Sequence, residues 1–476
     1  MNIMSLLNLL FQGNAGLSAG TFIPGTRLMF GFIKRMLGIG SGKPATISDD
    51  SLPRALQLHS APAKAPPFPG RLAPPVVLQR DEIIDGKTRI AGYRFSARRP
   101  ETAQEPDPSS TLEILAANNV ATFAERRLAL IPLTAGDWWR HDYTLLIGPH
   151  TTFLLALPAD AALADAWNEA AAAIHHAGAK IALSGSDILT HRPAILDHAD
   201  FLLLDFSSFS LAKLEQSLNS LRQEKPALEF IADNVSSWPE YRYCVSRGIS
   251  CCLGAFTTEQ DEEQKTKEIG ESRLVLIEML NQLRKEAELT YIALVAKRDP
   301  GVLVKLMSMA NSPLMGLSQK VVSIDQAIMV LGREKLYRWL SIAMFRAGTS
   351  SPRDEVLLEL ALARGRFLEA LGQEKHNKLE CDELFLLGLL SLLDILLGVP
   401  MSAVVEKINL SPLLMEALLN SDGPLARYLM LAVAVEKGHV QNVARLAEQL
   451  DYSLEAVESA SIEALGWAEE AVHLSE

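Results

Sequence analysis

Short apolar runs recur between positions 76 and 258, each four to eight residues long and rich in Leu, Ile, Val or Phe. Continuous apolar runs of this length are typical of strands buried on both faces, because a half-exposed strand would alternate apolar and polar positions. The pattern therefore predicts strands in this part of the chain. The runs are VVLQ, RIAGYRF, LALIPL, TTFLLAL, KIALSG, FLLLDF, LEFIAD and SCCLGAF.

Helical patterns separate several of these runs. The Ala-rich segment ADAALADAWNEAAAAIHHAGA closes with Gly178, and SLAKLEQSLNSLRQE places Leu211, Leu214, Leu218 and Leu221 on one helix face. Strands that alternate with helices predict a parallel α/β unit. About eight strands favour a small or eroded TIM-like (β/α)8 barrel, and a doubly wound open sheet is the alternative.

From about position 263 the chain shows helical periodicity and no convincing strand. A charged segment, EQDEEQKTKEIGESR, connects the two halves. The segment SIDQAIMVLG predicts a helix that opens with Ser323 and Gln326 as a capping box and closes on Gly332. The second half is therefore predicted to be an all-α domain of some 200 residues.

The most apolar stretch is LFLLGLLSLLDILLGVPM, with Asp394 inside it and Pro400 near its end. A charged residue in the middle of a bilayer is costly, so this stretch predicts a core helix and no integral membrane span. Asp394 is expected to bond to a neighbouring helix or to water.

The start of the chain differs in composition from the rest. Residues 44–75 are rich in Pro, Ala and Ser, which is typical of a semi-rigid linker. We expect a poorly ordered tail and linker over 1–75, with Met29 as an alternative translation start to Met1; MFGFIKRMLGIG is alternatively an amphipathic segment that touches a membrane or partner. The predicted division is then barrel 76–258, connector 259–272 and all-α domain 273–476.

Composition narrows the class of function. Hydrophobic residues make up 48% and charged residues 21%, as in a globular protein. The net charge of −12 argues against a nucleic-acid partner, and 6% aromatic residues argue against base-stacking surfaces. Four cysteines without a C-x-x-C motif indicate reduced structural thiols in a cytoplasmic protein, and a redox role for the adjacent Cys251 and Cys252 is the alternative.

The segment RDPGVLVKLMSMANSPLMGLSQKVVSIDQAIMVLGREKLYRW resembles the HDOD domain, a non-hydrolytic relative of the HD and HD-GYP metal phosphohydrolases. The resemblance rests on Asp299-Pro300, Leu303, Lys305-Leu306, Ala310-Asn311-Ser312, Ile324, Gln326-Ala327 and Leu331-Gly332. Pro300 begins a helix, and Asn311 and Ser312 are expected to bond backbone groups where it stops, with ligand binding as the alternative. The resemblance implies a domain that binds a protein partner.

Residues 76–258 resemble an EAL domain, the barrel phosphodiesterase of cyclic di-GMP signalling. ALEFIADNVSSWPEYRYCVSRGISCCLGAF follows that family's late strand, helix and final strand, and IAGYRFSAR has the outline of its first catalytic strand, Gly-x-Glu-x-x-x-Arg. Arg94, however, stands where that strand carries its acidic residue. The tandem resembles bacterial signal-transduction proteins described as EAL plus modified HD-GYP.

The EAL resemblance implies a site in which carboxylates hold two divalent ions, which need five or six oxygen ligands. Matched by motif, this chain replaces most of those residues and keeps Asp205. Arg94 replaces the first Glu, Pro132 an Asn, Ala156 a second Glu, Ser184 and Gly185 an Asp pair, and Leu203 a Lys. Asp233 and Ser236 stand for further Glu residues, and Leu253 for a Gln.

These replacements predict that the barrel has no catalytic residue, no metal and no cofactor. A guanidinium repels a divalent ion, so Arg94 is expected to pair instead with Asp205 or Asp233 across the barrel mouth. In the second half, Ser391 and Leu392 stand where the HD enzymes carry a His-Asp ligand pair. His376, His439 and His473 are scattered there, which also predicts no metal site.

The sequence therefore favours a non-enzymatic bacterial signalling scaffold, with a degenerate EAL barrel and an HDOD domain that binds a protein partner. One alternative is an effector that binds cyclic di-GMP without cleaving it. An active phosphodiesterase is the least favoured interpretation.

Overall fold

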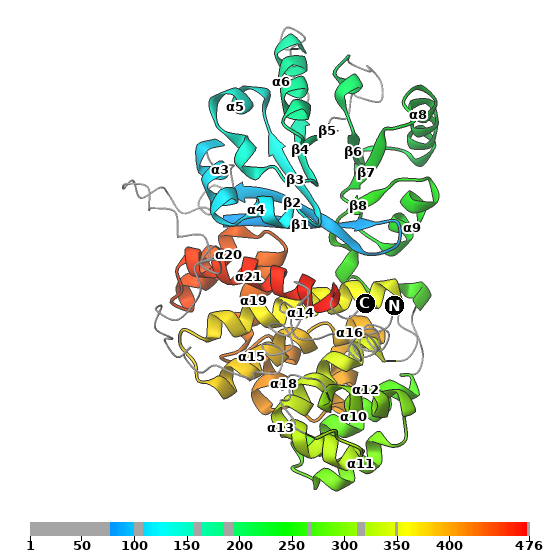
Figure 1. The fold of residues 1–476 in the computed structure, drawn as a ribbon, viewed down its shortest axis with the longest axis vertical. Helices are drawn as coiled ribbons and strands as arrows, with labels where there is room; N and C mark the ends of the chain where they lie inside the picture. Colours follow the sequence, from blue (N-terminus) through cyan, green and yellow to red (C-terminus); the bar gives the residue numbers. More distant parts are fainter. Residues whose placement is uncertain are drawn as a thin grey trace, which may run out of the picture.

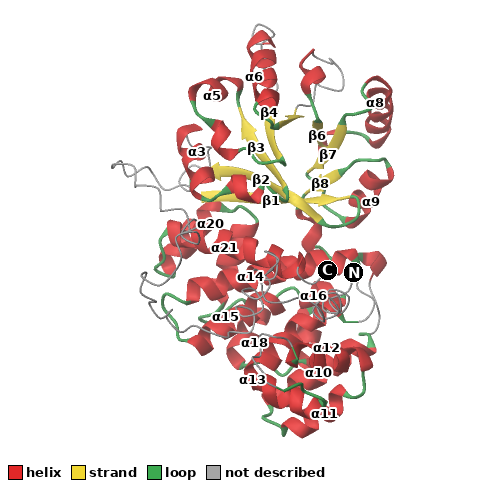
Figure 2. Ribbon diagram, in the orientation of Figure 1, coloured by secondary structure: helices red, strands yellow, loops and turns green. Residues whose placement is uncertain are grey.

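The computed structural model describes residues 77–99, 108–156, 164–184, 194–264, 269–311, 319–347 and 351–473. The tail and linker predicted over 1–75 lie outside these ranges, as do Gly185 and Ser312. A β-barrel stands on a helical domain, with the strands in the upper half of the molecule and helices alone in the lower half (Figures 1 and 2). Among the described helices, none is long and apolar enough to cross a membrane.

Each of the eight apolar runs forms one strand of a closed barrel in chain order. Strand β1 is antiparallel to both of its neighbours, β2 and β8, and the remaining neighbours are parallel. The structure thus confirms the barrel and excludes the open sheet. The strands are β1 (Val77–Asp85), β2 (Ile90–Arg98), β3 (Leu128–Leu133), β4 (Thr151–Ala156), β5 (Lys180–Ser184), β6 (Phe201–Asp205), β7 (Glu229–Asp233) and β8 (Cys251–Leu253).

The barrel strands are apolar on both faces because one face lines the lumen and the other packs against outer helices. The lumen is filled by a separate apolar cluster: Ile83, Leu130, Leu154, Ala182, Phe201, Leu203, Ile231 and Leu253. The outer helices are α3 (Pro108–Ala117), α4 (Val120–Phe123), α5 (Ala135–Arg140), α6 (Ala164–His176), α8 (Leu211–Glu224) and α9 (Trp238–Ser246). On α8, Leu214, Leu218 and Leu221 are buried as expected, but Leu211 in the first turn is half-exposed.

The second half is helical throughout its described part, as predicted. Its helices are α10 (Glu271–Arg284), α11 (Leu289–Ala296), α12 (Pro300–Ala310), α13 (Ile324–Ala343), α14 (Pro352–Gly372), α15 (Lys378–Leu390), α16 (Leu393–Leu397), α17 (Met401–Lys407), α18 (Pro412–Asn420), α19 (Ala426–Glu436), α20 (Val440–Gln449) and α21 (Leu454–His473). The long helix α14 is buried on most sides and packs against α15 and α21.

Gly332 ends the first helical segment of α13 as predicted: its φ of 71° and ψ of 167° are non-helical, and a second helical segment follows it to Ala343. The prediction of one helix over the most apolar stretch was wrong, because α15 ends at Leu390 and α16 begins at Leu393. Helix α16 then stops at Gly398, whose positive φ of 65° is a left-handed conformation that favours glycine.

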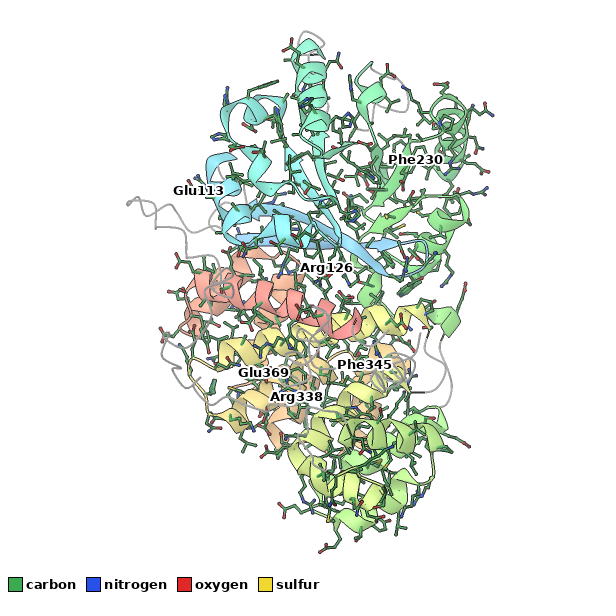
Figure 3. The ribbon with its side chains drawn as sticks, in the orientation of Figure 1. Glu113, Arg126, Phe230, Arg338, Phe345 and Glu369 are labelled. Atoms are coloured by element: carbon green, nitrogen blue, oxygen red, sulfur yellow. The ribbon has the colours of Figure 1, made fainter. Side chains whose placement is uncertain are left out.

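Helices α14 and α15 approach each other closely at two glycines. A Cβ atom on Gly388 of α15 would lie 2.6 Å from the Cα of Gly365 on α14. Close to this crossing, Arg338 of α13 donates to both carboxylate oxygens of Glu369 on α14, at 2.7 and 3.1 Å, in the middle of the domain (Figure 3). The guanidinium of Arg338 also covers the ring of Phe385, 3.6 Å from its centroid. The buried charges of Arg338 and Glu369 are thus paired.

The barrel and the helical domain meet along β1, which packs against α19, α20 and α21 (Figure 1). Successive side chains of a strand point to opposite faces. Accordingly, Ile83 lies in the lumen and Asp81 bonds to Arg94 of β2, whereas Arg80 donates to Ser461 of α21. One strand therefore contributes to the barrel interior and to the contact between domains.

Candidate functional site at the barrel mouth

The carboxyl ends of the parallel strands meet at one rim, where TIM-like barrels carry their functional residues. The structure places most of the motif-matched residues at this rim. Ala156 and Ser184 are register partners at the ends of β4 and β5, and Asp205 and Asp233 are register partners at the ends of β6 and β7. Pro132 is the last but one residue of β3, and Leu253 ends β8. These six residues therefore lie toward one end of the barrel.

Arg94 forms ion pairs with two carboxylates at this rim. Its Nη1 lies 2.5 Å from Asp233 Oδ2, and its Nε lies 2.9 Å from Asp81 Oδ2. Burial acts to lower the pKa of Arg94, but the two carboxylates outweigh it and raise the pKa above its ordinary value. The expected pair with Asp233 is confirmed, and Asp81 is a partner that the sequence did not indicate.

Asp205 is held by its own loop and does not contact Arg94. Its carboxylate accepts hydrogen bonds from Ser207 Oγ at 2.7 Å, Ser208 Oγ at 2.6 Å and Asn234 Nδ2 at 3.1 Å. These bonds lower the pKa of Asp205 to about 2, so the side chain is ionised at neutral pH. The carboxylate that matches the family motif thus caps a turn.

The remaining matched positions supply few ligand oxygens. Leu203 and Leu253 are buried in the apolar lumen, and Ser236 is exposed, where it bonds to Glu240 at 2.8 Å. No group of three or more His, Cys, Asp or Glu residues is placed to hold a metal ion in the part of the chain that the structure describes. At the described rim, the guanidinium of Arg94 lies between the carboxylates of Asp81 and Asp233.

The HDOD motif residues cap helices and hold a loop through hydrogen bonds to its backbone. Asp299 caps α12 by accepting hydrogen bonds from the amides of Gly301 at 2.7 Å and Val302 at 3.1 Å, and Pro300 is the first helical residue. The Asn311 side chain bonds to Met307 O at the end of α12, and to both the N–H and the O of Val321. Asn311 therefore has the structural role that its position predicted.

The capping box at the start of α13 is only partly as predicted. Ser323 accepts a hydrogen bond from the amide of Gln326, as expected for an N-cap. The Gln326 side chain, however, accepts from the amide of Val322, one residue before the cap. Ala310 is fully buried at the end of α12. These motif residues shape the turn between α12 and α13.

An arginine also occupies the region that matches the HD ligand pair. Arg364 of α14 donates to Ser391 Oγ at 2.6 Å and to both carboxylate oxygens of Glu436, at 2.8 and 2.6 Å. Asp394 lies nearby on α16, where burial raises its pKa. Its Oδ1 is buried and has no hydrogen-bond partner among the described residues, so this oxygen does not make the expected bond to a neighbouring helix.

No pattern in the sequence indicated the residues that join the two domains. Arg127, in the turn before β3, donates to both oxygens of Glu359 on α14, at 2.6 and 3.1 Å, and its Nε lies 3.3 Å from Glu469 on α21. The three side chains are only 6%, 7% and 9% exposed. The partners are 232 or more positions apart in the chain, a separation at which local patterns carry no information.

Residues 273–408 match the family model of the HDOD domain, which confirms that part of the resemblance. The cyclic di-GMP phosphodiesterase CdgJ of Vibrio cholerae is 24% identical over 288 residues, and the uncharacterized protein YuxH of Bacillus subtilis is 28% identical over 278 residues. These alignments cover 60% and 57% of this chain. They span 66% of each relative, just under two thirds of its length.

EAL domains are found among the solved structures similar to this chain. Klebsiella pneumoniae BlrP1, in a complex with manganese and cyclic di-GMP, is 18% identical with a TM-score of 0.32, over 39% of this chain and 55% of that one. The FimX EAL domain of Pseudomonas aeruginosa, bound to cyclic di-GMP, is 14% identical with a TM-score of 0.30, over 38% of this chain and 88% of that one.

Proposed function

We propose that this chain is a cyclic di-GMP signalling protein that does not hydrolyse the nucleotide, and that it acts as a scaffold. The ion pairs of Arg94 with Asp81 and Asp233 carry the proposal. The name of the CdgJ relative, a cyclic di-GMP phosphodiesterase with 24% identity, supports the link to this signalling system. The HDOD domain would then bind a protein partner in the cytoplasm.

The chemistry of hydrolysis supports the loss of activity. Two divalent ions must be held by several carboxylates so that a water between them is activated. Asp81 and Asp233 share the guanidinium of Arg94, and Asp205 is bonded within its own turn. A divalent ion would have to displace a charge-paired guanidinium before it could use these carboxylates, which is electrostatically unfavourable.

Exposed apolar side chains support a protein-binding role for the HDOD domain. Met329 of α13 is 62% exposed and Leu294 of α11 is 57% exposed, and these two helices pack together. Val322, directly before α13, is 76% exposed. Large exposed apolar groups on neighbouring elements are typical of surfaces that bind partners.

The full chain is expected to leave cyclic di-GMP intact when incubated with Mg²⁺ or Mn²⁺, as measured by chromatography of the nucleotide. The Arg94→Glu variant is also expected to be inactive, because Pro132, Ala156 and Ser184 still supply no carboxylate. Hydrolysis by the unmodified chain that disappears in Asp205→Asn would contradict the proposal.

Calorimetry with cyclic di-GMP tests the scaffold role separately. We expect no micromolar binding, because Arg94 is already committed to two carboxylates and is not available to a phosphate. Micromolar binding in the absence of metal would instead favour an effector that binds the nucleotide without cleaving it.

A further inference from the structure

We infer that docking of the barrel onto the helical domain takes up protons at the outer face of β1, so that the contact is tight in mild acid and loosens toward neutral pH. The inference concerns regulation of the contact between domains. It does not depend on whether the barrel hydrolyses or binds cyclic di-GMP.

The outer face of β1 is bonded directly to α21. The amide of Leu78 donates to Glu458 Oε1 at 2.9 Å. Arg80 donates to Ser461 O at 3.3 Å and also to Ser461 Oγ. Two positions further along β1, Glu82 is on the same face as Arg80, because side chains of a strand alternate. Glu82 and Glu458 therefore both belong to the contact between the domains.

Negative charges outnumber positive ones around Glu82 and Glu458. The charged or titratable groups that face Glu82 are Arg80 and Asp81 of its own strand, Tyr93 opposite it on β2, Glu436 of α19 and Arg364 of α14. Those that face Glu458 are Arg80 and, on its own helix, Glu455.

Three of these groups already have partners of opposite charge. Arg364 is paired with Glu436 through two hydrogen bonds, and Asp81 is paired with Arg94. Among the groups that face Glu82 and Glu458, Arg80 is therefore the one positive charge that is available to both carboxylates. With both carboxyl groups ionised, the contact would hold an excess negative charge in a partly buried place, which is unfavourable.

The pKa values agree with this imbalance. Burial raises the pKa of Glu82 from 4.5 to about 7, and the neighbouring Glu436 adds to the rise. Burial also raises the pKa of Glu458 from 4.5 to about 7, although the Leu78 amide and Arg80 act in the opposite direction. Both groups therefore retain a proton in the docked form at a pH where the separated surfaces would have released it.

The sign of the pH effect follows from proton linkage. Between about pH 5 and 7 the docked form binds more protons than the undocked form, so docking weakens as the pH rises. Each carboxyl group contributes up to about a tenfold decrease in the docking equilibrium per pH unit in this range. Above about pH 7 both forms are ionised, and the dependence levels off.

Hydrogen–deuterium exchange of the full chain tests this inference at pH 5.5, 6.5 and 7.5. Peptides from β1 and α21 should lose protection as the pH rises, relative to a β6 peptide that experiences the same intrinsic change in exchange rate. In the Glu82→Gln/Glu458→Gln variant, the loss should largely disappear, because the amide mimics the protonated acid. Glu82→Gln alone should remove part of it.

Glu448→Gln is the matched control, because Glu448 is an exposed residue of α20, a helix that also packs against β1. This variant should behave as the unmodified chain does. Equal pH dependence in the double variant and in the unmodified chain would overturn the inference. So would lower protection of β1 in the double variant at pH 7.5.

Discussion

Replacing Arg127 by methionine should lower the free energy of unfolding by about 3–5 kcal/mol, because it removes the guanidinium that pairs with the buried carboxylate of Glu359. Glu359 and Glu469 are each less than a tenth exposed and face Arg127 from two different helices. Methionine retains the length of the side chain, so most of the loss would be electrostatic. Urea unfolding at pH 7 measures the change.

Two further variants distinguish the loss of stability caused by an unpaired buried charge from the loss that any mutation would cause. Lys378→Ala removes an exposed ion pair with Glu334 and should cost less than about 1 kcal/mol. Adding Glu359→Gln to Arg127→Met should recover part of the lost stability, because the buried carboxylate that lost its guanidinium is then neutral. A loss under about 1 kcal/mol for Arg127→Met would show that water reaches these carboxylates.

Gly388→Ala should destabilise the helical domain by about 1–3 kcal/mol, because the added methyl group has no space. Its Cβ would lie 2.5 Å from the Gly365 N and 2.6 Å from the Gly365 Cα. These are backbone atoms of α14, which cannot turn aside as a side chain does. Thermal and urea unfolding of the full chain measure the effect.

Gly466→Ala is the matched control for this prediction. Gly466 is a helical residue of α21, and nothing lies within 4 Å of the Cβ it would gain. Since alanine favours a helix over glycine, this variant should be stabilised by up to about 1 kcal/mol. Similar changes in the two variants would mean that α14 and α15 separate easily at their crossing.

The barrel could be predicted from sequence because its strands are apolar on both faces. The exception is the second half of β1, where the predicted run stopped at Gln79 but the strand continues to Asp85. Residues 80–82 are Arg, Asp and Glu, which interrupt any apolar pattern. The partners of these residues lie on other strands and helices, which the local sequence does not indicate.

The helical domain was harder to predict where burial is complete. Helix α14 has buried charged residues, such as Glu359 and Arg364, among its apolar ones, so it shows no clear apolar face. In the stretch after Leu384, leucines on all sides hid the break at Ser391 and Leu392. Apolar periodicity does not indicate such a break, because leucines occupy most of the neighbouring positions on every side.

The candidate site was predicted in part. The pairing of Arg94 with Asp233 could be expected because both residues matched positions at the same rim. Asp81 was missed because β1 carried no matched motif position, although it lies directly opposite Arg94 in the β1–β2 register. A complete strand assignment for β1 would have identified it.

The alternation along β1 also bears on how the barrel acquires its correct pairing during folding. A slip of one residue would turn Arg80 and Glu82 into the lumen and Asp81 outward, since the side-chain period is two. The hydrogen bonds of Leu78 and Arg80 to α21 would be lost in the slipped register, so they favour the observed one. They join residues that are 380 and 381 positions apart in the chain. Contacts of such long sequence separation form slowly, and the contact between β1 and α21 can form only after α21 has been synthesised.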